Sequence, residues 1–395
     1  MNKALSGVRV LDFSQVLAGP FCTMNLADLG AEVIKIEKPE TGDGSRIFGP
    51  FIEDQSGYYI LVNRGKKGIT LDLKSPTAQA IIYEMVKTSD VVVENFKPGV
   101  MEKLGFSYEK FREINPRIVY CSISGFGQDS PYRDLAAYDI VAQGMAGIMS
   151  ITGYPDNPPA RVGSSLGDIS AGMYAVFGIM TALYSRERTG KGQYVDIALL
   201  DSVFAFAETN VVRYTIGNIM PKRVGARHPL SAPFDLYRCK DGLVIIAIAS
   251  DGHFAKLCKL MGQPDLSKDP KFDSDPHRSE NDVELKGIIE QFFADYTVEQ
   301  ALEMMQARAL PCGPLHDIGQ ACNDPSILQR EMLVEIDQPG AGKLTITGNP
   351  VKLSETPVDP KHPAPILGQD NKAVLCGMFG YSEEQFAQWE KENLF

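Results

Sequence analysis

The alternation of strand and helix patterns over the first 125 residues constrains the fold more than any other feature of the chain. Short apolar runs typical of buried strands occur at residues 8–13, 32–37, 69–74, 90–96 and 117–127. Helical patterns separate them, such as GPFCTMNLADLG, with a proline in its first turn and a glycine at its end. Strands joined through helices form βαβ units with right-handed crossovers. The predicted fold class is therefore α/β, with a Rossmann-like parallel sheet.

The texture changes near Arg223, where a second domain is predicted to begin. With 395 residues the chain is long enough for two domains. FDLYRCKDGLVIIAIA has the pattern of a hairpin that turns at Lys240-Asp241-Gly242, and helical segments follow it. LVEIDQPGAGKLTIT, at 333–347, predicts another hairpin, and a proline-rich stretch at 350–365 precedes C-terminal helices.

The charge balance and the metal-binding residue types exclude several classes of protein. Fifty acidic side chains against 39 basic ones give a net charge of −11, which argues against a nucleic-acid or anionic-membrane partner. The seven cysteines form no C-x-x-C pair and the five histidines are scattered, so we expect neither a disulfide framework nor a metal site. The N-terminus lacks the pattern of a signal peptide, and we expect a cytoplasmic protein.

Common nucleotide-binding and hydrolase motifs are missing from the sequence. The turn after the first strand is SQVLAGP and contains no G-x-G-x-x-G, and no P-loop pattern occurs. No G-x-S-x-G elbow occurs either, which disfavours an ordinary serine hydrolase. A parallel sheet without these motifs indicates a ligand other than a dinucleotide or a P-loop nucleotide.

The stretch LGDISAGMYA, residues 166–175, places Asp168 directly before a long helical pattern. Its apolar residues Ile169, Met173, Val176, Phe177 and Met180 fall on one helical face. An aspartate here can cap the helix by accepting hydrogen bonds from its first amides. It can also serve as a carboxylate nucleophile, and the two roles are compatible.

Polar residues gather after the predicted strands, where the ligands of α/β sheets bind. They are Gln15, Lys38, Arg46, Asn95 and Lys97. Lys38 and Arg46 bracket ETGDGS and are candidates for phosphate binding, with solvated surface charge as the alternative.

Seven segments in this order resemble the family III CoA-transferases, also called the CaiB/BaiF family, over essentially the whole chain. They are LDFSQVLAGPFCTMNLADLGAEVIKIEKPETGD, VNRGKKGITLDLK, VVVENFKPGVMEKLG, YCSISGFGQ, GDISAGMYA, RTGKGQYVDIALLD and PCGPL. The resemblance implies that Asp168 attacks the thioester of an acyl-CoA, giving a mixed anhydride and then an aspartyl-CoA thioester. It implies coenzyme A as a substrate, and we expect no permanently bound cofactor.

The resemblance also carries over binding residues and an architecture. Those matching the CoA site are Val16, Leu17, Lys38, Asn95, Phe96, Lys103, Leu104 and Tyr138. The implied architecture is a large CoA-binding α/β domain at residues 1–222, a small α+β domain at 223–328 and a C-terminal segment at 329–395 that returns to the large domain. Two such chains interlock in the family, so a homodimer is expected.

Departures from the family pattern sharpen the expected reaction. Tyr138-Asp139 stands where α-methylacyl-CoA racemases have histidine and aspartate, and a racemase needs a base on each face of the α-carbon. A glycine run and a glutamine at Leu17, features of formyl-CoA:oxalate transferases, are missing, which disfavours oxalate and formate. The GARHP and NRGKK stretches are similar to the branch of the family that acts on dicarboxylates such as succinate, and Arg46, Arg64 and Arg227 are candidates for binding the second carboxylate.

Three alternatives to a CoA-transferase remain open at this point. An acyl-CoA racemase or isomerase on the same scaffold would exchange the α-proton with solvent without any acceptor acid. A non-catalytic CoA-binding protein would bind CoA and exchange no acyl group. A nicotinamide dehydrogenase is the least compatible with the motifs.

Overall fold

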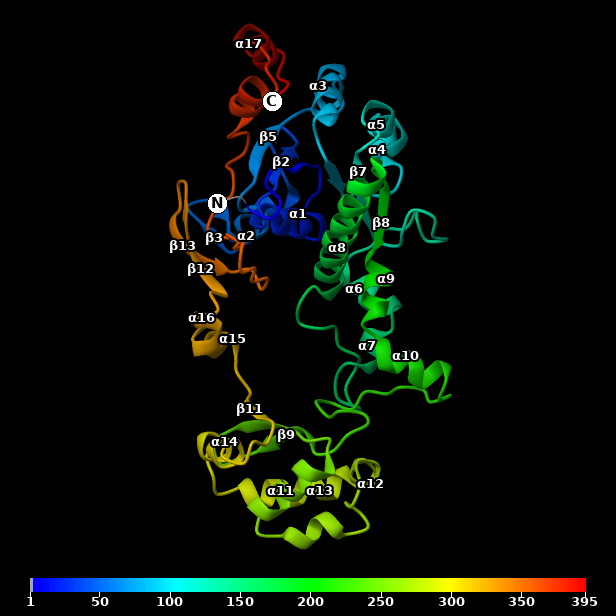
Figure 1. Cartoon of the computed structure of the whole chain (residues 1–395), viewed down its shortest axis with the longest axis vertical. Coiled ribbons are helices and arrows are strands. Elements are labelled where there is room, and N and C mark those ends of the chain that lie inside the picture. The colour runs from blue at the N-terminus through cyan, green and yellow to red at the C-terminus, as the bar shows by residue number, and fades with distance from the viewer. Residues whose placement is uncertain (1–2) are drawn as a thin grey trace. The chain divides into compact units, whose positions relative to one another are not determined.

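The computed structural model describes residues 3–395 and separates into two compact units (Figure 1). The first unit takes in the chain up to Ile148, Arg161–Val212 and Pro325–Phe395. The second consists of Met149–Ala160 and Arg213–Asp324.

The first unit is built on a six-stranded, fully parallel sheet. Its strands are β1 (Arg9–Asp12), β2 (Glu32–Glu37), β5 (Lys67–Thr70), β6 (Val91–Glu94), β7 (Val119–Ser124) and β8 (Tyr194–Ala198). Their order in the sheet is β5-β2-β1-β6-β7-β8. This is the doubly wound order, which reverses direction between β1 and β6 and leaves a crevice at their carboxyl ends.

Helices and two short hairpins complete the first unit and its connections. The helices are α1 (Ala18–Asp28), η1 (Gly44–Ile47), α2 (Gly57–Asn63), α3 (Pro76–Lys87), α4 (Val100–Lys103), α5 (Tyr108–Ile114), α6 (Asp139–Met145), α7 (Ile148–Ile151), α8 (Leu166–Thr189), α9 (Leu199–Ala205), α10 (Glu208–Thr215), α16 (Pro325–Gln329), a π-helix (Ala373–Met378) and α17 (Glu383–Lys391). The hairpins are β3 (Phe51–Ile52) with β4 (Gln55–Ser56), and β12 (Leu333–Gln338) with β13 (Gly342–Thr347).

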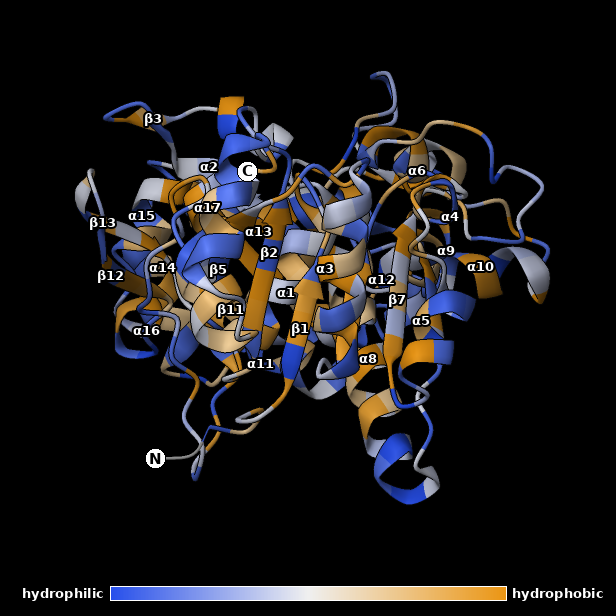
Figure 2. Ribbon diagram, turned by 90° about the horizontal axis from the view of Figure 1, so that it is seen from above, coloured by the Kyte–Doolittle hydropathy of each residue, from blue (hydrophilic) through white to orange (hydrophobic). Residues whose placement is uncertain are grey.

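Both faces of the sheet are covered by helices. Leu11 belongs to an apolar core with residues of α3, α5, the π-helix and α17, so the two ends of the chain share this core. The next residue, Asp12, accepts a hydrogen bond from Thr23 of α1. Successive strand residues point to opposite faces, which places α1 on the face opposite α3. Figure 2 shows the apolar character of β1 and β2 at the centre of the sheet.

Helix α8 packs closely against α1 through small residues. A side chain at Gly172 would lie 2.7 Å from the Ala18 carbonyl oxygen and 2.9 Å from Phe21 Cδ1. The apolar face noted in the sequence is largely outside the core, with Met173 57% and Phe177 71% exposed. By length and composition α8 could also cross a membrane, a criterion that core helices of soluble proteins meet as well.

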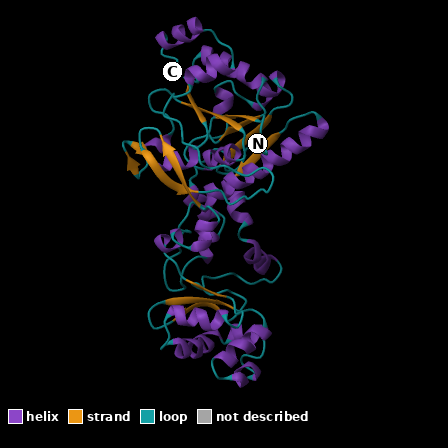
Figure 3. Cartoon of the chain, turned by 60° about the vertical axis from the view of Figure 1, so that its left-hand side comes forward, coloured by secondary structure: helices purple, strands orange, loops and turns teal. Residues whose placement is uncertain are grey.

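The second unit has its own sheet and core. The antiparallel order is β11-β10-β9, and the core includes Val244, Phe254 and Ile289. Its elements are β9 (Phe234–Arg238), β10 (Leu243–Ala247), α11 (Asp251–Leu260), η2 (Pro264–Lys268), α12 (Asp275–Glu280), α13 (Asp282–Phe293), α14 (Val298–Gln306), β11 (Cys312–Pro314) and α15 (Ile318–Cys322). Helices α11 and α13 lie on one side of this sheet (Figure 3).

The alternating pattern predicted these elements well. All five strands expected before residue 130 are present, and both expected hairpins form at β9-β10 and β12-β13. The strand expected at 69–74 lies earlier, at Lys67–Thr70, because the chain turns towards α3 after Thr70. The α/β class with a parallel sheet is confirmed.

Candidate active site

A cavity of about 350 Å³ opens at the carboxyl ends of β1, β6 and β7, where the strand order reverses. Asp168 is the carboxylate in its wall. The lining residues come from the β1–α1 loop, the segment after β6, the end of β7, the loop before α6 and the start of α8 and α9: Gln15–Ala18, Asn95–Pro98, Ile123–Gly125, Arg133, Leu135–Tyr138, Asp168 and Leu199.

Asp168 lies in the first turn of α8 and does not cap it. The helix begins at Leu166 with Ser165 in the capping position, so the prediction of a capping role for Asp168 was wrong. Gly167 N–H, the amide just before Asp168, donates to Asp139 Oδ1 at 2.7 Å. Within residues 3–395, no group donates a hydrogen bond to the Asp168 carboxylate or pairs with it. The carboxylate is therefore left for a ligand.

Burial raises the pKa of Asp168 from its ordinary value to about 6, and the nearby Asp139 carboxylate adds to the rise. Asp139 begins α6 and also accepts a hydrogen bond from Gln143 Nε2 at 2.8 Å. At neutral pH Asp168 is mostly ionised, yet it is more basic than an exposed aspartate. This combination suits a carboxylate nucleophile.

Another part of the cavity wall is the β1–α1 loop, whose backbone is held by hydrogen bonds from side chains. Asn95, the first residue after β6, accepts from Gln15 N–H at 2.7 Å and donates to the Gln15 carbonyl oxygen at 2.8 Å. Val16 takes a left-handed conformation with φ 66°, unusual for a β-branched residue. Helix α1 begins directly after this loop, and no side chain caps its first turn.

The structure brings together eight of the residues nominated from the sequence. The residues that line the cavity with Asp168 are Gln15, Val16, Leu17, Asn95, Phe96, Lys97 and Tyr138. Lys103 and Leu104 line a different hollow, beside Leu73–Pro76 and Gln79. Lys38 is exposed and lines neither of these cavities.

The three arginines considered for a second carboxylate are paired within the chain. Arg46 donates to both carboxylate oxygens of Glu37 at 2.7 Å. Arg64 is buried and makes the same two-point contact with Asp28, at 3.0 and 2.7 Å. Arg227 pairs with Asp282 at 3.1 Å in the second unit. The sequence did not reveal these partners. Asp28 and Asp282 are far along the chain from their arginines, and Glu37 is one of several acidic residues that precede Arg46.

The site also contains Tyr58 and Arg133, which the sequence analysis did not name. Burial, and then the Asp168 carboxylate, raise the pKa of Tyr58 to about 12, which places this α2 side chain in the field of the site. Lys97 and Arg133 line the cavity, and no described carboxylate pairs with either. An unpaired cation in a cavity that contains an aspartate is a signal that only the fold reveals.

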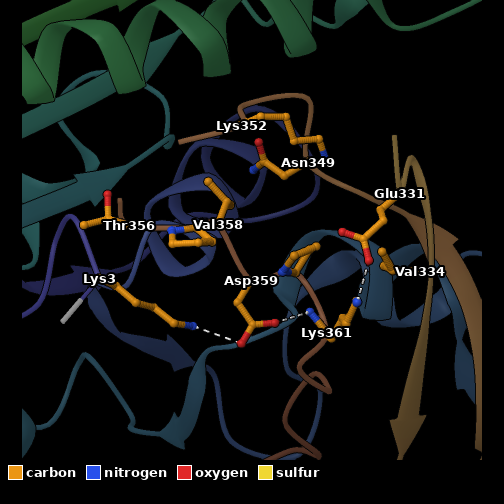
Figure 4. Close-up of a pocket in the computed structure, with 11 residues that line it drawn as sticks. Lys3, Glu331, Val334, Asn349, Lys352, Thr356, Val358, Asp359 and Lys361 are labelled. Atoms are coloured by element: carbon orange, nitrogen blue, oxygen red, sulfur yellow. Dashed lines mark hydrogen bonds and ion pairs between the residues drawn. The ribbon is translucent and has the colours of Figure 1, made fainter. Parts of the chain in front are cut away.

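Another hollow of similar size, about 330 Å³, contains no unpaired carboxylate among the residues that line it (Figure 4). Both of its carboxylates are paired, Asp359 with Lys3 at 3.1 Å and Glu331 with Lys361 at 2.9 Å. The cavity with Asp168 is the better candidate because its carboxylate has no partner. Across residues 3–395 no cluster of metal-ligating side chains occurs.

Comparisons with known proteins decide the family. The description "CoA-transferase family III" matches residues 5–371. The chain belongs to this family. It is a CoA-transferase, and CoA thioesters are the substrates of its relatives.

Named relatives cover nearly the whole chain. An acetyl-CoA:oxalate CoA-transferase from Acetobacter aceti is 43% identical over 349 residues, 88% of each chain. A succinate–glutarate CoA-transferase from Agrobacterium fabrum is 39% identical over 94% of this chain and 95% of its own. A succinyl-CoA:mesaconate CoA-transferase from Haloarcula hispanica is 41% identical, with 94% and 96% covered.

A solved CaiB/BaiF family protein from Brucella suis has the same fold. It superposes with a TM-score of 0.84 at 36% identity, covering 95% of this chain and all of that one. The family resemblance and the Rossmann-like sheet predicted from the sequence are thus confirmed.

Proposed function

We propose that this CoA-transferase moves CoA from an acyl-CoA to a free dicarboxylic acid through covalent intermediates on Asp168. The observation that carries the proposal is the unpartnered Asp168 carboxylate in a cavity at the carboxyl ends of the parallel strands. Membership of the family supports the reaction class.

The proposed first half-reaction loads CoA onto the enzyme. An Asp168 carboxylate oxygen attacks the thioester carbonyl carbon, the C–S bond breaks, and CoA leaves as a thiolate. The thiolate then attacks the Asp168 carbonyl carbon of the mixed anhydride. This step releases the donor acid as a carboxylate and leaves an aspartyl-CoA thioester.

The second half-reaction reverses these steps with the acceptor acid. Its carboxylate attacks the aspartyl carbonyl carbon and expels CoA thiolate, giving a new mixed anhydride. The thiolate attacks the acceptor's acyl carbon, which yields the new acyl-CoA and frees the Asp168 carboxylate. No net proton is consumed. The first-turn amides of α1, uncapped by any side chain, are suitable donors for the negative charge that develops on the carbonyl oxygen.

Two unpaired cations in the cavity support a dicarboxylic acceptor. Lys97 and Arg133 line it beside Asp168, whereas Arg46, Arg64 and Arg227 are already paired. A second carboxylate can bind such cations while the first reacts. The relatives' names include oxalate, glutarate and mesaconate, all dicarboxylic acids. Oxalate, which the sequence analysis disfavoured, therefore belongs among the acceptors to be tested.

The experiment is a matrix of donors and acceptors. Acetyl-CoA and succinyl-CoA are each mixed with oxalate, glutarate, mesaconate and, as the matched monocarboxylate, butyrate, and new acyl-CoA is measured by mass spectrometry. We expect transfer to at least one dicarboxylate and at least about tenfold less to butyrate, the loss expected for an unpaired charged contact. Preferred transfer to butyrate would contradict the dicarboxylate assignment, and loss of α-deuterium without an acceptor would instead favour a racemase.

We further propose that the protein is a homodimer. Helix α8 leaves Met173, Phe177 and Tyr184 exposed on a surface where monomeric proteins usually keep apolar patches small. Covering this face with a second copy would remove it from water. Light scattering after gel filtration tests the mass, and a monomer at micromolar concentration would contradict the proposal.

A further inference from the structure

The β1–α1 loop is held by a buried ion pair that does not itself reach the cavity. Lys35, on β2, and Asp43 are both fully buried and lie 2.8 Å apart, Nζ to Oδ2. Neither lines the cavity with Asp168. The pair nevertheless makes hydrogen bonds with the backbone of the β1–α1 loop, which lines the cavity.

The two members of the pair hold the backbone on either side of Gln15. Lys35 Nζ donates to the Ser14 carbonyl oxygen at 2.7 Å, and Val16 N–H donates to Asp43 Oδ1 at 3.0 Å. Asn95, the first residue after β6, holds Gln15. Three successive residues are thus fixed by side chains of Lys35 on β2, of Asn95 after β6 and of Asp43 before η1.

Val16 requires such a restraint. Its φ of 66° lies in the left-handed region, which a β-branched residue avoids unless the surroundings impose it. Without a partner for its N–H, the residue would relax towards negative φ and move the part of the cavity wall that Gln15, Val16 and Leu17 form.

Asp43 is itself firmly fixed. Its Oδ1 also accepts from Ser45 N–H and Ser45 Oγ, both at 2.8 Å, and its own N–H donates to Glu37 Oε2 at 2.8 Å. Glu37 is clamped by Arg46 and by Tyr59 Oη. The paired Arg46 therefore belongs to the support of this loop.

We propose that Asp43 is a positioning residue for CoA transfer, holding Val16 in its left-handed conformation and so fixing this part of the wall of the cavity that contains Asp168. The inference rests on the proposed function. A loop displaced by about 1 Å can lower a rate up to about 100-fold, although the displaced group touches no reacting atom.

The first test is a pair of single variants. Asp43→Asn removes the ion pair with Lys35, and the neutral amide oxygen that remains accepts from Val16 N–H more weakly than the carboxylate does. We expect kcat/KM for the acyl-CoA to fall at least about tenfold and the Kd for CoA itself to rise. The matched control is Asp28→Asn, which breaks another buried pair, with Arg64, at the opposite end of α1. It should lower the melting temperature similarly and leave kcat/KM and Kd within about twofold, since Asp28 is remote from the loop.

The second test is rescue by glycine, which accepts a positive φ without strain. The loss caused by Asp43→Asn is measured again in a Val16→Gly background. We expect that loss to shrink to less than about threefold, because the restraint is no longer needed. Equal losses in both backgrounds would overturn the inference and assign Asp43 a purely structural role.

Hydrogen exchange on the unmodified protein covers the case in which Asp43→Asn does not fold. The Val16 amide should exchange far more slowly than the amides of the exposed 129–135 loop, because its hydrogen is bonded to a buried carboxylate. Rapid exchange at Val16 would overturn the inference. Failure of the wild type to transfer CoA while it still binds CoA would refute the proposed function instead, and the Kd comparison would still decide the role of Asp43.

Discussion

The aspartates under the β1–α1 loop and those at the start of α8 have opposite electrostatic surroundings. Under the β1–α1 loop each buried carboxylate faces a lysine, Asp12 with Lys66 at 2.9 Å and Asp43 with Lys35 at 2.8 Å. At the start of α8, Asp168 faces another carboxylate, Asp139, and no cation.

Their acidities differ accordingly. Burial alone would raise the pKa of Asp43, but Lys35 and the hydrogen bonds from Ser45 and Val16 lower it to about 2. Burial and Asp139 raise the pKa of Asp168 to about 6. A paired carboxylate supports structure, whereas an unpaired one in a cavity is available for chemistry.

Replacing the unpaired aspartate should have the largest effect on activity. Asp168→Asn keeps the shape of the side chain but replaces the nucleophilic carboxylate with a neutral amide. We therefore expect kcat to fall by at least about 10³-fold. The assay is transfer between acyl-CoA and the preferred acceptor. Circular dichroism and CoA binding serve as controls, and a variant that binds CoA and retains a tenth of the wild-type rate would contradict a nucleophilic role.

The β1–α1 loop and the start of α8 are connected through the contact between α1 and α8. Gly172→Ala should therefore disturb the position of both. The added carbon would lie 2.7 Å from the Ala18 carbonyl oxygen. We expect the free energy of unfolding to drop by about 1–3 kcal/mol and activity to fall with it. Gly252→Ala in α11 is the control, because its added carbon meets nothing within 4 Å. Equal stability of both variants in chemical denaturation would show that the α1–α8 contact is looser than described.

The pH dependence of stability should distinguish Asp43 from Asp168, because ionisation of Asp43 stabilises the fold and ionisation of Asp168 destabilises it. The pKa of Asp43 is lowered on folding, so its contribution of about 2 kcal/mol is complete above pH 4 and is lost as the pH falls through 2. The pKa of Asp168 is raised, so its ionisation costs about 3 kcal/mol of folding free energy, a cost that is absent below pH 4 and complete above pH 6. Asp43→Asn should therefore flatten the acid limb of the unfolding curve, and Asp168→Asn should stabilise the protein at pH 7. A destabilised Asp168→Asn would indicate a hidden partner.

Removing the like charge should have the smallest effect. Activity should decline below pH 6 as Asp168 becomes protonated, and Asp139→Asn should move that limb of the kcat/KM profile to lower pH. The shift should stay under about 1 unit because burial is the larger cause. The exposed Asp134→Asn is the control and should leave the limb unmoved, and an upward shift in Asp139→Asn would be incompatible with like-charge repulsion.

The sequence predicted the sheet, because strand runs and helix boundaries are local patterns. It also singled out Asp168 together with seven other residues of the cavity, through motifs that lie between or just after predicted elements. The capping role of Asp168 was wrong because α8 begins two residues earlier, at Leu166, with Ser165 in the capping position.

Partners distant along the chain explain the rest of what could not be predicted. Arg64 and Asp28 are 36 residues apart, and nothing local distinguishes this buried pair from an arginine that awaits a ligand. The large apolar residues of α8 likewise recur with a helical period, which is typical of a buried face. In the structure it is the small residues of α8 that pack against α1. Such choices depend on tertiary contacts that periodicity does not encode.

The most direct test of the central claim is to trap the intermediate on Asp168. The wild-type protein is incubated with its preferred acyl-CoA and hydroxylamine, digested and analysed by peptide mass spectrometry, with Asp168→Asn treated in parallel. The account predicts a hydroxamate on the peptide that contains Asp168, dependent on the acyl-CoA and missing from the variant. Continued CoA transfer with Asp168 unmodified, or a hydroxamate on another carboxylate such as Asp139, would contradict it.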